Sequence, residues 1–506
     1  MEQLTGIDSY MLYSERGNNY NHVAALGIYD PSTAPGGKVR FKDILKHFSC
    51  RLDTHKLFRR RLMTVPGGVD RPYWVENADL DIEFHIRHLA LPQPGDWRQL
   101  MIQVARLHSR PMDRTRPLWE VYVIEGLDRI PGLPRSSFAL FIKFHHASVD
   151  GMAAAAVLKA VHSLTASDDA RARKDATSHA DRDPTAVELY SRAIAHGAAR
   201  TAGLSSLYVK TLGKLAKLTL GEMVRQVNPD ASGRSLPAIV KAPVTRFNHP
   251  VSANRVVEAV AVPIEAMKKA RAKLEGVTIN DFFLTIVGGA LHKYLHSKGE
   301  LPAKSLMALM PISLREDGKA GKGGNQVGGV PVAVHSEIAD PLERLVACQR
   351  DAQEAKRGAD ALGREFLNSV INELPNAAAD VFMKRFVFPQ LNTTVSNVRG
   401  PDAVLYAAGA RLVHFYPVSI ATDYVGLNHT GFSYNGVMWI CVVACRNMMP
   451  DPGFYADCLR ESASELFAAI GAMRGAKRPA KVKRSAKATS RKPSTTKQQR
   501  AAASAS

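Results

Sequence analysis

The most constraining feature of the sequence is a strand pattern that ends in a pair of histidines. An apolar run from Phe138 to Phe144 is followed by His145-His146-Ala147-Ser148-Val149-Asp150-Gly151. The alanine-rich stretch 152–161 that comes next is typical of a helix. The segment therefore predicts a buried strand, a short turn and a helix, with both histidines fixed at the end of the strand.

The two histidines are candidates for proton transfer, because imidazole takes up and releases a proton near neutral pH. Side chains alternate along a strand, so His145 and His146 face opposite sides if the strand continues through them. Only one of them can then face a given cleft. The alternative for His146 is a hydrogen-bonded core histidine. Asp150, four residues after His146, is interpreted as a helix N-cap or a buried salt-bridge partner, with direct chemistry as the alternative.

The histidine motif resembles the HHxxxDG acyltransferases, which include chloramphenicol acetyltransferases and peptide-synthetase condensation domains. Further segments, in the same order, resemble bacterial wax ester synthase/diacylglycerol acyltransferases: Asp113-Arg-Thr-Arg-Pro-Leu-Trp-Glu120, Thr278-Ile-Asn-Asp281, Pro311-Ile-Ser-Leu-Arg315, Gly324-Asn325 and Thr394-Val-Ser-Asn-Val-Arg-Gly-Pro401. Arg399 stands where that family usually has proline. The resemblance runs from Leu4 to about residue 470.

The resemblance implies an α/β (α+β type) fold of two chloramphenicol-acetyltransferase-like domains. Each domain would hold a mixed sheet flanked by helices, with an active-site tunnel between the two. It assigns His146 as the general base within a catalytic motif that also contains His145 and Asp150. Asn280, from the second domain, would stabilise the oxyanion or orient the substrate; its alternative is a cap for a helix over residues 281–296. Four residues would contact substrate: Gly151, Asp281, Ser396 and Asn397.

The implied reaction is direct acyl transfer from long-chain acyl-CoA to a fatty alcohol or a diacylglycerol, without a covalent acyl-enzyme. No cofactor and no metal are expected, and acyl-CoA is a co-substrate whose phosphates basic residues at the tunnel mouth could bind. Two alternatives belong to other classes. One is a condensation-type enzyme that forms amides, and the other is a non-enzymatic coat protein of lipid droplets.

The charge of the chain suggests a lipid surface as a partner. The net charge is +20, and the stretch 474–500 is rich in Lys and Arg. A basic amphipathic helix is predicted over residues 207–227; it could lie on an anionic membrane or lipid droplet, or pack across two domains. The basic tail could bind anionic lipid, or it could merely aid solubility. It lacks interleaved aromatic residues, so nucleic acid is not expected as a partner. An odd number of cysteines, 5, and no apolar stretch long enough to span a bilayer favour a cytoplasmic protein attached peripherally to the inner membrane or lipid droplets.

The pattern of composition divides the chain into four parts. We expect an N-terminal acyltransferase domain over residues 1–165 and a linker with the basic helix over 166–240. A C-terminal acyltransferase-like domain would follow over 241–473, and a disordered basic tail over 474–506. Periodicity predicts strands at 80–89, 255–262, 306–310, 330–334 and 437–444, and helices at 97–107, 264–273, 281–296, 341–356 and 455–474.

Overall fold

The computed structural model describes residues 1–76, 80–149, 158–167, 182–203, 205–206, 241–313, 327–362 and 366–473. Several sequence predictions fall outside this part of the chain. They are the roles of Asp150 and Gly151, most of the predicted helix 152–161, the basic helix 207–227 and the basic tail.

The first half of the chain supplies four strands of a six-stranded mixed sheet, the N-terminal sheet, with the strand order β12-β13-β2-β7-β6-β5. Within it β5 and β6 run parallel, and all other neighbours are antiparallel. Its strands are β2 (His22–Asp30), β5 (Ile86–Ala90), β6 (Trp119–Glu125), β7 (Phe138–His145), β12 (Tyr406–Ala407) and β13 (Ala410–Val418). The helices of this half are α1 (Gly6–Tyr13), α2 (Phe41–Ser49), α3 (Ile82–His85) and α4 (Trp97–His108). A small sheet lies beside them, formed by β1 (Glu2–Gln3), β3 (Arg60–Met63) and β4 (Tyr73–Glu76).

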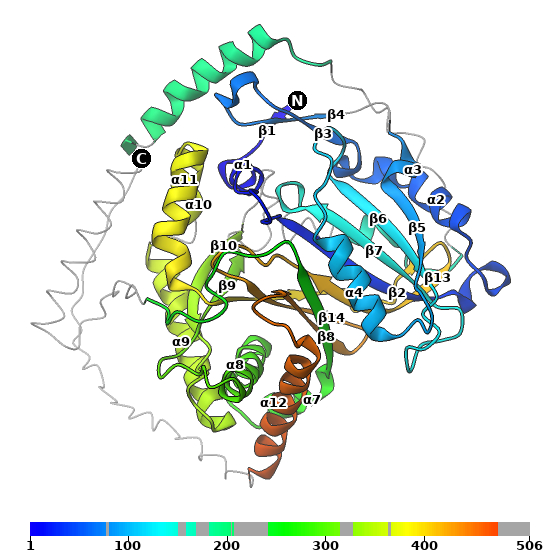
Figure 1. Cartoon of the computed structure of the whole chain (residues 1–506), viewed down its shortest axis with the longest axis vertical. Helices are drawn as coiled ribbons and strands as arrows, with labels where there is room; N and C mark the ends of the chain where they lie inside the picture. The colour runs from blue at the N-terminus through cyan, green and yellow to red at the C-terminus, as the bar shows by residue number, and fades with distance from the viewer. Residues whose placement is uncertain are drawn as a thin grey trace, which may run out of the picture.

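The second half builds another six-stranded mixed sheet, with the order β10-β9-β11-β14-β15-β8. Its strands are β8 (Arg255–Pro263), β9 (Met307–Ser313), β10 (Val327–Ala333), β11 (Thr393–Arg399), β14 (Leu427–Tyr434) and β15 (Val437–Cys445). The helices are α7 (Ile264–Ala272), α8 (Ile279–Ser297), α9 (Pro341–Leu362), α10 (Phe366–Glu373), α11 (Asn376–Phe382) and α12 (Pro452–Ala472). Figure 1 shows α7, α8 and α12 on one side of this sheet. The predicted class, two mixed-sheet α/β units flanked by helices, is confirmed.

The C-terminal sheet is apolar on both faces, and the two-residue period of its strands divides it between two cores. In β15, Trp439 and Cys441 join the core that contains the N-terminal sheet, whereas Ile440 and Val442 join the core beneath the helices of the second half. In β8, Val257 and Val260 divide in the same way. Such a strand is a continuous apolar run, which explains why 437–444 is readily recognised in the sequence. One face of the second sheet therefore serves as the apolar contact between the two halves.

Strands β12 and β13 belong to the N-terminal sheet although they lie late in the chain. β13 pairs antiparallel with β2 over Ala24 to Asp30, and β12 extends the same edge. The sequence range 241–473 thus contributes two strands to the sheet of the first half. This pairing is long-range, so local periodicity gives no indication of it.

The predicted strand over residues 80–89 is wrong in its first half. Residues Ile82–His85 form the short helix α3, and the strand β5 begins only at Ile86. The cause is local: the Asp81 side chain accepts the backbone N–H groups of Glu83 and Phe84, which stabilises a helical turn over the alternating pattern. The other predicted elements agree with the structure apart from shifts at their ends.

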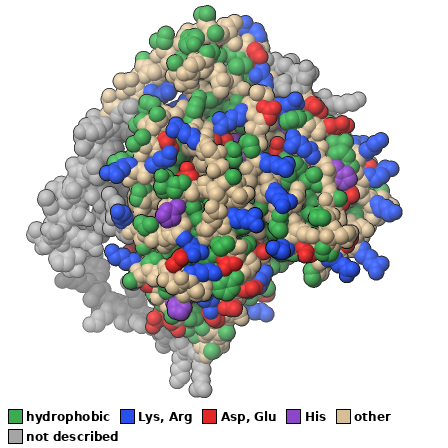
Figure 2. Space-filling model, in the orientation of Figure 1, with side chains coloured by type: hydrophobic (Ala, Val, Ile, Leu, Met, Phe, Trp, Pro, Cys, Tyr) green, Lys and Arg blue, Asp and Glu red, His purple; other side chains and the backbone are tan. Residues whose placement is uncertain are grey.

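Charge is dispersed over the face of the molecule that Figure 2 shows. On the face seen in Figure 2, Lys and Arg side chains are interspersed with Asp and Glu and do not form one basic field. In the part of the chain that the structure covers, no helix combines the length and the apolar character that crossing a membrane requires.

Candidate active site

The two histidines lie where the sequence predicts them, at the end of the buried strand β7. His145 is the last residue of β7, and His146 opens a single helical turn, His146–Ser148. The turn is held from both sides: the His146 N–H donates to the Asn21 carbonyl at 2.8 Å, and the Ser148 hydroxyl donates to the His145 carbonyl at 2.7 Å. His145 is fully buried and His146 is half-buried. Of the two side chains, His146 is therefore the more accessible.

His145 is fixed by a carboxylate that the sequence analysis did not single out. Its Nδ1 accepts the Ala147 N–H at 3.0 Å, and its Nε2 lies 3.0 Å from Oε1 of Glu15. Glu15 also accepts the Asn21 N–H at 2.5 Å and a guanidinium N–H of Arg114 at 2.6 Å. Burial alone would raise the pKa of the Glu15 carboxyl, but these partners together hold it below its ordinary value. Glu15 therefore locks the orientation of the first histidine.

A buried lysine lies next to this pair on the same face of β7. The Lys143 ammonium donates to the carbonyls of Leu107 at 3.1 Å and Arg110 at 2.6 Å, and it lies 3.4 Å from Glu120 Oε2. Burial lowers the pKa of Lys143 to about 8, although the Glu120 charge opposes that shift. The ammonium ties β7 to the C-terminal end of α4.

The segment 113–120 contributes two charged side chains to the surroundings of β7. Arg114 holds Glu15, and Glu120 faces Lys143. The segment thus supplies an ionic partner to each of two groups on one face of the strand that carries the histidines, Glu15 and Lys143. The sequence resemblance identified the segment, but only the fold shows which groups it contacts.

The second half of the chain brings together two of its predicted site residues. The side-chain N–H of Asn397, on β11, donates to Oδ1 of Asn280, near the start of α8, at 2.5 Å. Asn280 is half-buried and Asn397 is exposed. Ser396 precedes Asn397 and lies opposite Thr430 on β14. This bond occupies the Asn280 oxygen and leaves its amide N–H groups as the donors available to a substrate.

These residues lie where the second sheet opens. Strand β11 pairs with β14 from Thr394 to Arg399, but it pairs with β9 only at Thr393 and Thr394. From Val395 onward, one edge of β11 therefore has no ladder to β9. Polar side chains at Ser396 and Asn397 are accommodated at this opening without breaking a continuous sheet.

Asp281 has a structural position, and Asn280 is not the helix cap. Thr278 is the N-cap of α8, and the Asp281 carboxylate accepts both the N–H and the hydroxyl of Thr278 at 2.8 Å. Asp281 is also nearly inaccessible, with 3% of its surface exposed. The reciprocal bonds form a capping box that fixes the first turn of the helix, and Asn280 projects from that turn.

A helix from the first half connects the histidine turn to the second half. Helix α1 packs against the turn His146–Ser148 and against α10 and α11. Its first residue, Gly6, donates its N–H to Asn372 Oδ1 at 2.7 Å, and a Cβ at that position would lie 2.5 Å from the Asn372 backbone. Glycine is required there by this close approach. Across the described ranges, no three His, Cys, Asp or Glu side chains are grouped so as to hold a metal ion.

Comparisons with known proteins agree with this architecture over most of the chain. The structure is similar to a wax ester synthase/diacylglycerol acyltransferase from Marinobacter aquaeolei, with a TM-score of 0.65 and 26% identity over 93% of this chain and 100% of that one. It shares its fold with the starter condensation domain of rhizomide synthetase, with a TM-score of 0.51 and 11% identity over 93% of this chain and 94% of that one. Fold and histidine turn thus define a two-domain acyltransferase of the chloramphenicol-acetyltransferase-like class.

The sequence narrows that class. Residues 4–283 match the wax ester synthase/diacylglycerol acyltransferase catalytic domain, and residues 323–467 match the C-terminal domain of the same family. A Mycobacterium tuberculosis protein named for diacylglycerol O-acyltransferase activity is 31% identical over 475 residues, covering 92% of this chain and 90% of its own length. The chain belongs to the wax ester synthase/diacylglycerol acyltransferase family.

Proposed function

We propose that the protein transfers a long-chain acyl group from acyl-CoA to the hydroxyl of a fatty alcohol or a diacylglycerol, with His146 as the general base. The observation that carries this proposal is the asymmetry of the histidine pair. His145 is buried and held by Glu15, whereas His146 stays half-buried on a turn that is fixed through its backbone. A positioned and approachable imidazole is what direct acyl transfer needs.

The proposed chemistry takes place without a covalent enzyme intermediate. The His146 imidazole removes the proton of the acceptor hydroxyl as its oxygen attacks the thioester carbon. The tetrahedral oxyanion then collapses, the carbon–sulfur bond breaks, and the thiolate takes the proton from the imidazolium. The products are an ester, free CoA thiol and the neutral histidine with which the cycle began.

Asn280 is the proposed donor to the oxyanion. Its oxygen is already engaged by Asn397, so the amide is oriented before substrate arrives. The cap formed by Thr278 and Asp281 fixes the backbone from which Asn280 projects. In this proposal Asn397 and Asp281 position Asn280, and Ser396 lines the same opening. Asp150 and Gly151 remain predictions from the sequence.

The deciding experiment measures thiol release from palmitoyl-CoA with three acceptors: hexadecanol, dipalmitoylglycerol and an aminoacyl thioester. Release with a hydroxyl acceptor, accompanied by the ester, supports the proposal and ranks the two lipid acceptors. Transfer to the amine alone would replace it with a condensation-type reaction. No transfer to any acceptor by folded protein would leave a lipid-binding role as the better account.

We also propose that the protein works on a lipid surface without spanning it, because its acceptors and products are poorly soluble in water and its net charge is +20. Attraction to anionic lipid is screened by salt. Co-sedimentation with anionic vesicles should therefore fall as salt rises, and deleting residues 474–506 should weaken it. Equal binding of the full-length and truncated proteins at low salt would exclude the tail from this role.

A further inference from the structure

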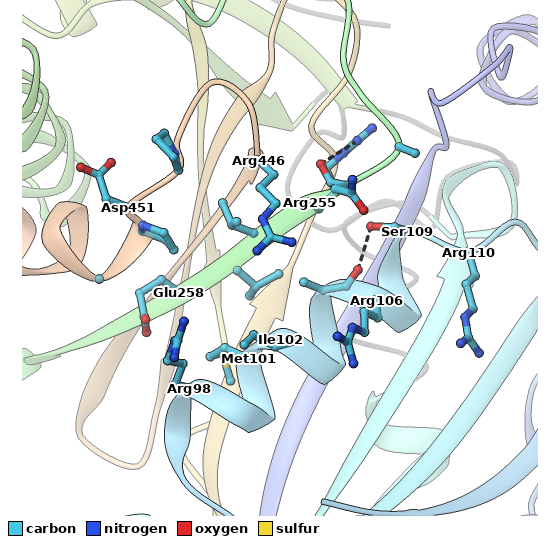
Figure 3. A pocket seen from close by; sticks show the side chains of 18 residues that line it. Arg98, Met101, Ile102, Arg106, Ser109, Arg110, Arg255, Glu258, Arg446 and Asp451 are labelled. Carbon is cyan, nitrogen blue, oxygen red and sulfur yellow. Dashed lines mark hydrogen bonds between the residues drawn. The ribbon is translucent and has the colours of Figure 1, made fainter. Parts of the chain in front are cut away.

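A pocket lies between the two halves of the molecule, where α4 of the first half faces β8 of the second. It has a volume of about 680 Å³, within the range of about 300–1,000 Å³ typical of small-molecule sites. Figure 3 shows α4 on one side and the turn after β15 on the other, with β8 between them. The cationic side chains among its lining residues are Arg98, Arg106, Arg110, Arg255 and Arg446.

These arginines differ from many other arginines of the described residues in their lack of carboxylate partners. Arg114 and Arg246, for example, bind Glu15 and Glu300 at 2.6 Å. Within the ranges that the structure describes, none of the five pocket arginines lies within ion-pair distance of an Asp or Glu. The guanidinium groups of Arg98, Arg106, Arg110 and Arg446 therefore remain available to a ligand, whereas that of Arg255 already donates to backbone carbonyls.

The two acidic residues of the pocket are already engaged by other groups. Glu258 accepts the indole N–H of Trp97 at 2.5 Å and the Ala259 N–H at 2.9 Å. Asp451 binds the Lys298 ammonium at 2.5 Å and accepts the Tyr294 hydroxyl at 2.7 Å. Because five arginines face these two carboxylates, the pocket carries a net positive charge.

The floor of the pocket is apolar, whereas its rim carries the charge. Met101, Ala105 and Val257 line it and are buried. Arg98, Arg106 and Arg446 are exposed at its edge, and Arg446 extends over β8 toward α4 in Figure 3. An apolar floor beneath several free guanidinium groups suits a flat heteroaromatic ring that carries phosphates.

One end of the pocket is connected to the histidine turn by a short segment. Arg255, which is 8% exposed, donates to the Asn18 carbonyl at 2.8 Å, and the Asn21 carbonyl accepts the His146 N–H at 2.8 Å. Three residues of chain span at most about 11 Å, so the Arg255 guanidinium lies within roughly 17 Å of the His146 backbone. An extended pantetheine arm has about as many backbone bonds as four residues and reaches about 15 Å.

We infer that this pocket binds the phosphorylated adenosine end of the acyl-CoA donor, so that the thioester reaches His146 from this side. The 3′-phosphate and 5′-diphosphate lie among the guanidinium groups of Arg98, Arg106 and Arg446, and the base lies on the apolar floor. The pantetheine arm follows the segment Asn18–Asn21 toward the histidine. This inference rests on the proposed acyl-CoA-dependent function and adds the site at which the donor is recognised.

The test compares two donors that share a thioester but differ in phosphate: palmitoyl-CoA and S-palmitoyl-pantetheine. The variant is R106A/R446A, which removes two exposed guanidinium groups from opposite sides of the pocket. The matched control is R271A, because Arg271, like Arg106, is an exposed arginine in the last turn of a helix, but it lies outside the pocket. Thermal melting confirms that each variant is folded.

The double variant should raise the KM for palmitoyl-CoA between about ten- and a hundredfold, as expected for lost hydrogen bonds to a charged group. Its kcat/KM for S-palmitoyl-pantetheine should stay within about twofold of the unmodified protein. The control should match the unmodified protein with both donors. Equal losses with both donors, or no loss with either, would overturn the inference.

A phosphate on a lipid headgroup could satisfy the same arginines, so a second arm separates the two sources. Binding to phosphatidylglycerol vesicles is measured for the same three proteins. A fall in vesicle binding with an unchanged KM for palmitoyl-CoA would assign the pocket to a headgroup and overturn the inference.

A third arm separates failure of this inference from failure of the proposed function. Calorimetric titration with adenosine 3′,5′-bisphosphate should show binding that R106A/R446A weakens and R271A preserves. Binding without any acyl transfer would retain the nucleotide site and reject the proposed reaction. Acyl transfer from palmitoyl-CoA without nucleotide binding would reject the site and retain the reaction.

Discussion

Both sheets have six strands, but the candidate site residues at the end of β7 differ in chemical character from those on β11. The end of β7 in the N-terminal sheet gathers ionisable groups: Lys143 and His145 are buried, and Glu15 and Glu120 face them. The end of β11 in the C-terminal sheet presents the neutral amides of Asn280 and Asn397. In the proposed mechanism, the first sheet therefore supplies the group that transfers the proton and the second sheet supplies the donor to the oxyanion.

The largest expected effect comes from the base. His146→Ala should lower turnover by about 10² to 10⁴, the range for a positioned proton-transfer group, without loss of folding. The measurement is thiol release from palmitoyl-CoA with the preferred acceptor. His249→Ala is the control, because His249 is exposed and lies outside the turn. Near-native turnover by a folded His146→Ala protein would show that His146 is not the general base.

The next largest effect is expected at Asn280, one of the two neutral amides of the C-terminal sheet's site. Asn280→Ala should lower kcat by roughly 10², since one oxyanion donor contributes about 3 kcal/mol, and should change KM for acyl-CoA much less. Asn280→Asp keeps an oxygen for Asn397 but loses the N–H donors, so it should be equally slow. Restored turnover in the Asp variant would mean that Asn280 only holds Asn397 in place.

A substitution of Glu15 measures how much this carboxylate stabilises the ionisable cluster at the end of β7. Glu15→Gln removes the charge that His145 and Arg114 share, and should lower the free energy of unfolding by about 2 kcal/mol. Because the pKa of Glu15 is lowered in the fold, its contribution is present above the ordinary carboxyl pKa and is lost as pH falls below it.

Urea denaturation of Glu15→Gln at pH 7 and at low pH measures both effects. Glu83→Gln is the control, because Glu83 is exposed on α3. The difference between Glu15→Gln and the unmodified protein should shrink as pH falls. A difference that is constant with pH would attribute the loss to packing and not to charge.

Both halves should lose stability in mild acid because each buries neutral histidines. Burial lowers the pKa of His47 and His162 in the first half to about 4, and that of His429 in the second to about 3. Unfolded histidines bind protons below about pH 6.5, so the unfolded state binds more protons between that pH and about 4, and stability falls as pH falls. At pH 5 each histidine should account for about 2 kcal/mol.

His429→Gln tests this assignment in the second half. The His429 ring lies 3.1 Å from the Thr393 hydroxyl and 2.7 Å from the Tyr455 hydroxyl, so the folded protein has no room for a solvated charge there. The variant should be less stable at pH 7 but should lose less stability between pH 7 and pH 5. An unchanged pH dependence in urea would show that the ring titrates in the fold.

The smallest expected effect concerns Asp281. Asp281→Ala removes the acceptor of both Thr278 bonds and should lower the free energy of unfolding by about 1 kcal/mol. Turnover per folded molecule should fall only slightly, because the rest of α8 still holds the turn that carries Asn280. Asp281→Asn keeps an acceptor oxygen and should lose less. A selective fall in turnover, without a change in thermal melting, would return Asp281 to the substrate-binding role that the sequence predicts.

Local patterns were sufficient for the elements that carry the candidate site. The strand β7, the helices α4 and α8, and the apolar strand β15 each have a length and period that a sequence window contains. The position of Glu15 beside His145 could not be predicted, because the two residues are far apart in the chain and meet only when α1 packs against the histidine turn. Lys143 within an apolar run was a visible signal, since a buried lysine requires partners.

The exchange of β12 and β13 into the N-terminal sheet also constrains how the chain can fold during synthesis. Strand β2 emerges early, but its partner on one edge, β13, ends only at Val418. Until then that edge offers unpaired N–H and C=O groups to any neighbouring chain. The first half is therefore an incomplete folding unit: production of residues 1–240 alone should yield aggregation-prone material, and the two halves should unfold together in one transition.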